Sequence, residues 1–172
     1  MEVFNGVELM ISDVVSFNLA GVACLQGLGS WNLEDCEYFS GMFPLHLQDP
    51  KIPIHVKEFW CVIVSVKIWG PRWSGQKVNI YCDNDAVCDV ITYCKPKDSN
   101  MQSLLREFLH WVCTFNFHPV VSKIGTKENS VADFLSRNYS PEDAISYFNK
   151  NNMSVMKNIP LTDSLLVLWA DW

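Results

Sequence analysis

The chain has 172 residues and a formal net charge of −6; 49% of its residues are hydrophobic and 13% are aromatic. This composition excludes a disordered chain and supplies a core for one domain or slightly more. No apolar run approaches the roughly 20 residues of a membrane-spanning helix, and the first ten residues lack the basic start of a secretory signal. The seven cysteines are odd in number and never spaced C-x-x-C. We therefore predict reduced thiols in an intracellular protein, cytoplasmic or nuclear, with no zinc site and no membrane contact.

Charge is distributed unevenly along the chain. Residues 1–50 carry seven acids and no Lys or Arg, and residues 128–172 carry six acids and three Lys or Arg. Residues 51–127 carry ten Lys or Arg and six acids. The basic excess of this middle segment fits either a solvated face or a surface that follows phosphate groups.

The first third of the chain predicts strands, because its apolar and β-branched runs alternate with turn residues. The expected strands lie at residues 7–14, at residues 19–25 and within residues 36–43. We expect Gly27 and Gly29 to turn the chain, so that the three strands form an antiparallel meander. A loop with three prolines follows, and residues 55–69 are too long for an ordinary strand and predict a helix. Glu58 falls in the first turn of that helix.

The rest of the chain alternates strands with helices. The expected strands are residues 78–82 and 117–124, and the expected helices are residues 86–93, 100–115 and 128–135. Asp83 ends the first of these strands, and Asp133 lies in the last helix. We therefore predict an α/β fold: a mixed five-stranded sheet, with three antiparallel strands followed by parallel ones, flanked by helices.

Four acids occupy positions that suit a metal site: Asp13, Glu58, Asp83 and Asp133. Ordinary roles also explain single members, since Asp83 can cap a helix and Glu58 can complement a helix dipole. Gathered carboxylates repel one another unless cations neutralise them. Mg²⁺ suits such a group, and two ions about 4 Å apart can hold the attacking and leaving oxygens of a phosphoryl transfer.

At this point the sequence resembles the ribonuclease H domain of retrotransposon reverse transcriptases, particularly DIRS-like and related elements. VNIYCDNDAV (78–87) and ENSVADFLSR (128–137) are similar to the D-N-x-A-V and N-x-x-A-D-x-L-S-R motifs of that family. Residues 55–76 resemble the helix and the glycine-rich turn that precede the third motif. The resemblance covers roughly residues 7–137. We therefore place a ribonuclease-H-like domain at residues 1–137 and a C-terminal extension, helical or loop-like, at residues 138–172.

The resemblance implies a metal-dependent endonuclease that cuts the RNA strand of RNA–DNA hybrids. Two Mg²⁺ ions would act, with Mn²⁺ as a substitute, and all four acids would be catalytic metal ligands. A polymerase domain in the same polyprotein would be a further partner. The positions expected to contact nucleic acid are Asn84, Lys95, Lys97, Lys123 and Lys127. As surface lysines, the loop residues among them are explained equally well by solvation.

Two departures from the family pattern favour an alternative function. The first motif, usually D-A-S-x-x-G-x-G, is placed here at Asp13, where both glycines are replaced. The loop that usually reads H-I-P-G-x-x-N has Lys123 in place of the histidine. The alternative is a catalytically inactive ribonuclease-H-like domain, either a decayed copy or a host protein derived from one, that binds nucleic acid or packs against a polymerase.

Overall fold

The computed structural model describes residues 2–4, 7–9, 15–154 and 156–168, and its side chains are described from residue 17 onward. Six strands form the main sheet in the order β7-β6-β3-β4-β5-β8. They are β3 (Val15–Ala23), β4 (Gly27–Asn32), β5 (Glu37–Met42), β6 (Lys77–Cys82), β7 (His118–Lys123) and β8 (Lys157–Asn158). Strands β3, β4 and β5 pair antiparallel, whereas β6 runs parallel to both β3 and β7. The predicted mixed sheet is thus confirmed, with two-residue β8 added in parallel beside β5.

The start of the chain differs from the prediction. Of the expected strand 7–14, the structure describes β2 (Val7–Leu9), which pairs antiparallel with β1 (Glu2–Phe4) in a two-stranded sheet of its own. The first strand of the main sheet is instead β3, from Val15 onward. Asp13 lies outside the described residues.

Gly27 and Gly29 do not turn the chain, because both belong to β4. The turn lies just before them, where the Cys24 N–H donates to the Gly27 carbonyl at 2.8 Å. The two glycines instead permit close packing of a helix on the sheet. A Cβ atom on Gly29 would stand 2.5 Å from the backbone of Leu135, a separation that no side chain tolerates.

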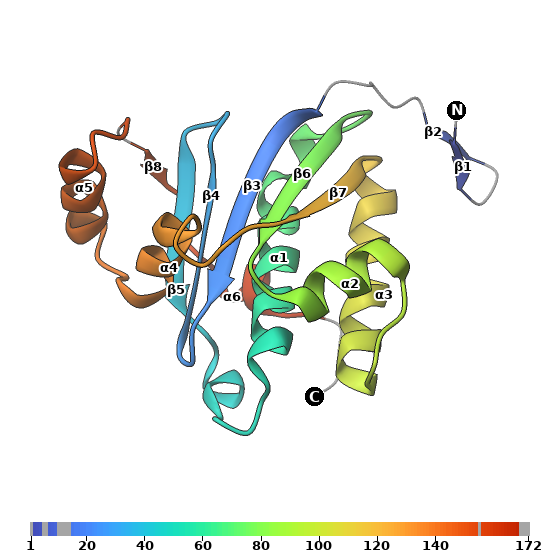
Figure 1. Cartoon of the computed structure of the whole chain (residues 1–172), viewed down its shortest axis with the longest axis horizontal. Coiled ribbons are helices and arrows are strands. Elements are labelled where there is room, and N and C mark those ends of the chain that lie inside the picture. The colour runs from blue at the N-terminus through green and yellow to red at the C-terminus, as the bar shows by residue number, and fades with distance from the viewer. Residues whose placement is uncertain (1, 5–6, 10–14, 155, 169–172) are drawn as a thin grey trace.

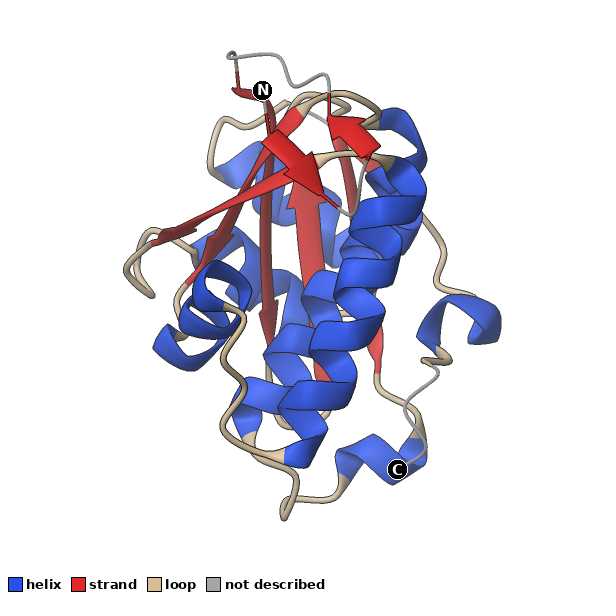
Figure 2. Cartoon of the chain, turned by 90° about the vertical axis from the view of Figure 1, so that its right-hand side faces the viewer, coloured by secondary structure: helices blue, strands red, loops and turns tan. Residues whose placement is uncertain are grey.

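Helices cover both faces of the sheet (Figure 1). The helices are α1 (Ile54–Trp69), α2 (Asp85–Tyr93), α3 (Ser99–Phe115), α4 (Ser130–Arg137), α5 (Pro141–Lys150) and α6 (Asp163–Leu166), with short 3-10 turns at η1 (Leu45–Gln48) and η2 (Gly70–Arg72). Helix α1 is buried along most of its length between the sheet and α3. Helix α4 packs on β4 from the opposite face. Figure 2 shows the helices and the twisted sheet from the side.

The apolar stripe predicted for residues 100–115 is the buried side of α3. Met101, Leu104, Leu105 and Phe108 are all at most 6% exposed. Because they recur at i, i+3, i+4 and i+7, they lie on one side of the helix and join the main core. No described helix combines the length and apolar character that a membrane span needs.

The C-terminal extension packs against the rest of the chain. Phe148 on α5 is fully buried, and its ring meets Tyr38 of β5 edge-on at 5.3 Å between centroids. Lys67 of α1 donates to three backbone carbonyls of the last segment, those of residues 164, 165 and 167, at 2.7–3.1 Å. Leu168 is buried in the main core. The boundary at residue 137 stays a prediction, but the extension shares the core of the preceding domain.

Candidate metal centre

Glu58 and Asp83 meet at the end of β6. Asp83 directly follows that strand, and Glu58 projects from the second turn of α1. Together with Cys82, they offer one oxygen or sulfur atom each, and these atoms lie within 4.8 Å of one another. Glu58 Oε2 and Asp83 Oδ1 are both buried and have no hydrogen-bond partner. Because buried charged oxygens are costly unless something neutralises them, this pair has the character of a cation site.

The electrostatics of the pair point the same way. Burial, with the nearby Asp83 and Cys88, raises the pKa of Glu58 to about 7, while a hydrogen bond with the Asn84 side chain opposes the shift. The carboxyl group is therefore unstable as a free anion in its surroundings. A bound cation would favour the ionised form.

Asn84, the residue after Asp83, caps the helix that follows β6. Its Oδ1 accepts hydrogen bonds from the N–H groups of Ala86 at 2.9 Å and Val87 at 3.4 Å, and so caps α2. Such caps satisfy backbone donors that the helix leaves free. Asn84, predicted as a nucleic-acid contact, therefore has two roles within the protein, the cap of α2 and the hydrogen bond with Glu58.

Asp133 is paired with a cation of its own helix. Its Oδ1 accepts two hydrogen bonds from Arg137 one turn later on α4, from Nε at 3.0 Å and from Nη2 at 2.9 Å. Among the described residues, the group that could hold a metal is Glu58, Cys82 and Asp83. Of the four acids predicted as ligands, the structure brings Glu58 and Asp83 together, pairs Asp133 with an arginine, and leaves Asp13 outside its described part.

An apolar residue stands level with Asp83 on the neighbouring strand. The parallel register pairs Leu19 with Ile80 and Ala20 with Tyr81, so two residues further along, Val22 lies beside Asp83. Neighbouring strands are about 5 Å apart. Val22 is 5% exposed.

Val22 also occupies the first position of the family motif once the sheet is known. It pairs with Gly29, and cross-strand partners project to the same face, here the face covered by α4. The spacing D-A-S-x-x-G-x-G then fits Val22 to Gly29, with valine in place of aspartate and Cys24 in place of serine. The spacing of the two glycines indicates this alignment in the sequence alone. It was missed because the glycines were interpreted as a turn.

Among the described residues, the donors that come together fit one divalent cation rather than two. Glu58 and Asp83 supply two carboxylates, and their unpartnered oxygens are free to bind. A second ion would need further negative charge beside Asp83, and Val22, the residue described at that place on the neighbouring strand, supplies none. Asp133 has its charge offset by Arg137.

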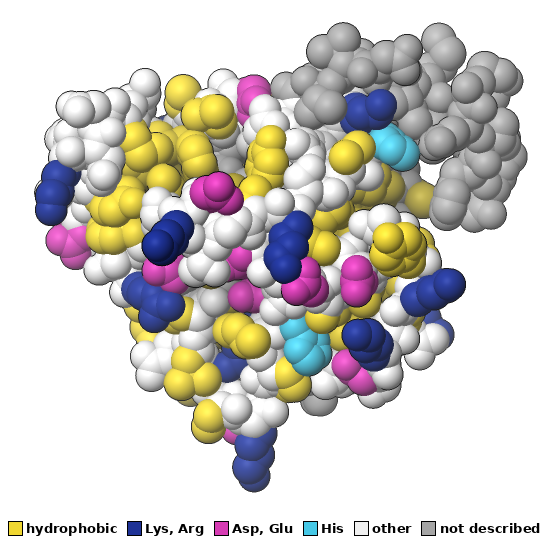
Figure 3. Space-filling view, viewed as in Figure 1, with side chains coloured by type: hydrophobic (Ala, Val, Ile, Leu, Met, Phe, Trp, Pro, Cys, Tyr) yellow, Lys and Arg dark blue, Asp and Glu magenta, His cyan; other side chains and the backbone are white. Residues whose placement is uncertain are grey.

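The predicted basic contacts lie at the surface. Lys123 ends β7 next to Cys82 in register and forms an ion pair with Asp85. Lys95, Lys97 and Lys127 are exposed. On the face shown in Figure 3, Lys and Arg side chains are interspersed with Asp and Glu, so this face carries no continuous basic patch.

Comparison with known proteins identifies the fold. No family model matches the sequence, and no curated protein matches it either. The structure resembles RNase H1 from the halophilic archaeon Halobacterium salinarum NRC-1, with a TM-score of 0.58 and 9% identity over 76% of this chain and 98% of that one. It also resembles the N-terminal RNase H domain of Rv2228c from Mycobacterium tuberculosis, solved as a fusion with maltose binding protein. There the TM-score is 0.51, with 13% identity over 80% of this chain and 99% of that one. The chain therefore has the ribonuclease-H-like α/β fold.

Proposed function

We propose that this domain binds RNA–DNA hybrids and holds one divalent cation, Mg²⁺ or Mn²⁺, between Glu58 and Asp83, without efficient cleavage of the RNA strand. The observation that carries the cation site is the pair of buried, unpartnered oxygens on these two side chains. The ribonuclease-H-like fold supports the choice of nucleic acid. The motifs at residues 78–87 and 128–137 support an origin in a retrotransposon reverse transcriptase, with a polymerase domain as the associated partner.

A cation at this place would act first on the protein itself. Bound between Glu58 and Asp83, it would offset the burial and the repulsion from Asp83 that together raise the pKa of Glu58. It could also accept a phosphate oxygen of the hybrid, because Mg²⁺ combines one or two carboxylates with phosphate ligands in many sites.

Cleavage of the RNA strand is the second candidate function. It is favoured by the meeting of Glu58 with Asp83 at the end of β6 and by the presence of Asp133 in α4. In that case all four predicted acids would be ligands of two ions. Val22 is the observation against it, because the strand next to Asp83 then supplies no carboxylate. We therefore rank binding without efficient cleavage first.

The experiment compares the wild type with Val22→Asp, Val22→Thr and Asp83→Asn. Val22→Thr is the matched control, since threonine keeps the branched shape of valine and adds no charge. We expect the wild type to bind a labelled hybrid and to cut it slowly or not at all in Mg²⁺ or Mn²⁺. Val22→Asp should cut measurably faster than both the wild type and Val22→Thr, because it adds a carboxylate beside Asp83.

Two results would contradict the proposal in different ways. A wild type that cuts the hybrid as fast as Val22→Asp, and loses this activity in Asp83→Asn, would establish the nuclease and reject the inactive domain. A wild type whose melting temperature is unchanged by Mg²⁺ and Mn²⁺ would reject the cation site, because a ligand that binds the folded state stabilises it.

A further inference from the structure

We infer that the thiol of Cys82 is the third donor of the cation site, so that the site selects a thiophilic divalent cation such as Zn²⁺ or Cd²⁺ over Mg²⁺. This inference rests on the proposed cation site at Glu58 and Asp83 and specifies its chemistry. The sequence predicted no zinc site, because no two cysteines have C-x-x-C spacing. Here a single cysteine joins two carboxylates that come from different elements.

The geometry places the sulfur among the carboxylates. Three atoms no more than 4.8 Å apart lie within about 2.8 Å of a common point, which is near the bond lengths of about 2.0–2.3 Å that Zn²⁺ forms with oxygen and sulfur. Cys82 is 1% exposed and Glu58 is 8% exposed, whereas Asp83 is half-buried, so a bound ion would be covered by protein on the side of Cys82 and Glu58 and open on the side of Asp83.

Neighbouring groups keep the sulfur of Cys82 protonated until a cation binds. A hydrogen bond with Cys88 and burial raise the pKa of Cys82, while a hydrogen bond from the backbone N–H of Asn84 opposes the shift. A cation must therefore displace the thiol proton in order to bind the sulfur. Cys88 also approaches the Cys82 carbonyl, at 3.7 Å. Among the described residues, Cys88 is not one of the group whose donor atoms lie within 4.8 Å of one another, so the site has three protein donors.

The donor set decides the metal. Thiolate is a soft ligand that favours Zn²⁺, whereas Mg²⁺ takes oxygen ligands in near-octahedral geometry and keeps several waters. A site with two oxygens and one sulfur suits Zn²⁺ better than Mg²⁺. Binding would deprotonate the thiol and release a proton, so affinity should rise with pH.

Cys61 provides a matched control. It is also a fully buried free thiol, but it lies one turn beyond Glu58 on α1, and its Sγ donates to the Gly29 carbonyl at 3.5 Å. Among the side chains that the structure describes, it does not belong to the group that could hold a metal. Cys61→Ser therefore tests the loss of a buried sulfur without the loss of a donor.

The experiment uses the full chain with the exposed cysteines Cys36, Cys94 and Cys113 replaced by serine, under a phosphine reductant. Zn²⁺, Cd²⁺ and Mg²⁺ are titrated separately against the melting temperature, and Cd²⁺ is also followed by the ultraviolet absorption of its thiolate bond. We expect Zn²⁺ and Cd²⁺ to act at concentrations about tenfold or more below that of Mg²⁺. Cys82→Ser should abolish the Cd²⁺–thiolate band and this preference while keeping the Mg²⁺ response, and Cys61→Ser should keep all three.

A Cd²⁺–thiolate band that is absent from the background protein, or that persists in Cys82→Ser, would overturn the inference. The same holds if Zn²⁺ and Mg²⁺ act at equal concentrations. If Cys82→Ser does not fold, Glu58→Gln in the background protein decides instead: it should weaken the Cd²⁺ band if sulfur and carboxylate share one ion, and an unchanged band would overturn the inference. Failure of the thiol leaves the Mg²⁺ response intact, whereas failure of the proposed cation site removes the response to every metal.

Discussion

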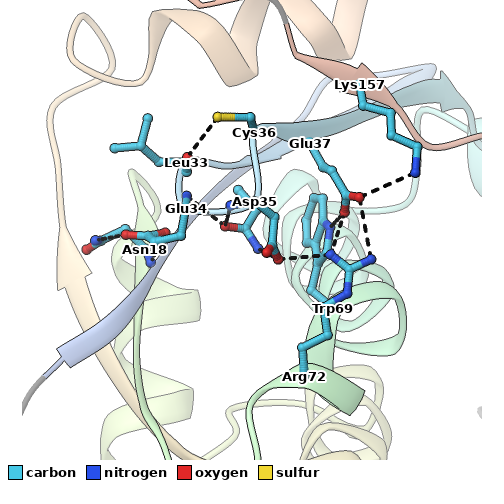
Figure 4. A network of polar contacts seen from close by, with 10 residues as sticks. Asn18, Leu33, Glu34, Asp35, Cys36, Glu37, Trp69, Arg72 and Lys157 are labelled. Atoms are coloured by element: carbon cyan, nitrogen blue, oxygen red, sulfur yellow. Dashed lines mark hydrogen bonds and ion pairs between the residues drawn. The ribbon is translucent and has the colours of Figure 1, made fainter.

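Glu37 and Glu58 are two buried glutamates with opposite surroundings. Glu37 is 6% exposed and Glu58 is 8% exposed, so both have lost most of their water. Glu37 accepts hydrogen bonds from Trp69 Nε1 at 2.9 Å and from Arg72 Nη1 at 2.7 Å, and Lys157 stands 3.7 Å away (Figure 4). Glu58 has an oxygen with no partner and a second carboxylate beside it.

Their pKa values shift in opposite directions as a result. Burial alone would raise the pKa of Glu37, but the hydrogen bonds from Arg72 and Trp69 and the positive charges of Arg72 and Lys157 outweigh it and lower the pKa. Burial and Asp83 raise the pKa of Glu58 to about 7. A buried carboxylate is therefore structural where neighbouring side chains donate to it, and it indicates a binding site where it has no such donors.

Glu37→Ala should give the largest loss of stability. The substitution leaves Trp69 Nε1 buried without an acceptor and removes the anion that Arg72 and Lys157 face. Breaking a buried ion pair costs about 3–5 kcal/mol, and the partial exposure of Arg72 places this case near 3 kcal/mol. Urea unfolding measures the loss, with the exposed Glu142→Ala as the control. A cost equal to that of the control would mean that the network in Figure 4 contributes nothing.

The raised pKa of Glu58 makes stability depend on pH in the direction opposite to that expected from the lowered pKa of Glu37. Its pKa is raised in the folded state, so the folded protein binds a proton more tightly than the unfolded chain does. Stability should therefore fall as pH rises from about 4.5 to about 7, by about 2–3 kcal/mol in metal chelator. Glu58→Gln should remove this fall and be at least as stable as the wild type at pH 8. A wild-type profile that is flat or rising over this range in chelator would contradict the contrast with Glu37.

A bound divalent cation should neutralise Glu58 as Arg72 and Lys157 neutralise Glu37. With Mg²⁺, Mn²⁺ or Zn²⁺ bound, Glu58 gains the partner that the fold withholds, so the fall in stability between pH 4.5 and 7 should disappear. The measurement is the same pH series with and without saturating metal, and Asp83→Asn is the control that should respond weakly. If metal leaves the slope of stability against pH unchanged, the raised pKa of Glu58 has no connection with a cation site.

The sequence predicted most elements but not the contacts between distant ones. The strand ending at Asp83 and the amphipathic stripe of α3 follow from local periodicity, and both are confirmed. Strand β4 was missed because glycine suits both turns and close helix packing, and only the position of α4 separates the two. The place of Val22 beside Asp83 depends on strand register, which no local pattern specifies. The partners of Glu37 likewise come from α1, η2 and β8, so the residues near Glu37 in the sequence do not indicate that this glutamate is paired.

Lys123→Met should have the smallest effect, and it tests whether the metal site adjoins the nucleic-acid surface. Lys123 lies at the end of β7 beside the site, is exposed and pairs with Asp85. Exposed ion pairs contribute little to stability, so the melting temperature should not change measurably. If Lys123 contacts a phosphate, hybrid binding should weaken and the slope of log affinity against log salt should fall by about one. Lys150→Met, on the exposed surface of α5, is the matched control and should leave the slope unchanged. An unchanged slope for Lys123→Met would place the hybrid away from this edge of the sheet, whereas equal losses for both lysines would show that binding follows net charge rather than a defined surface.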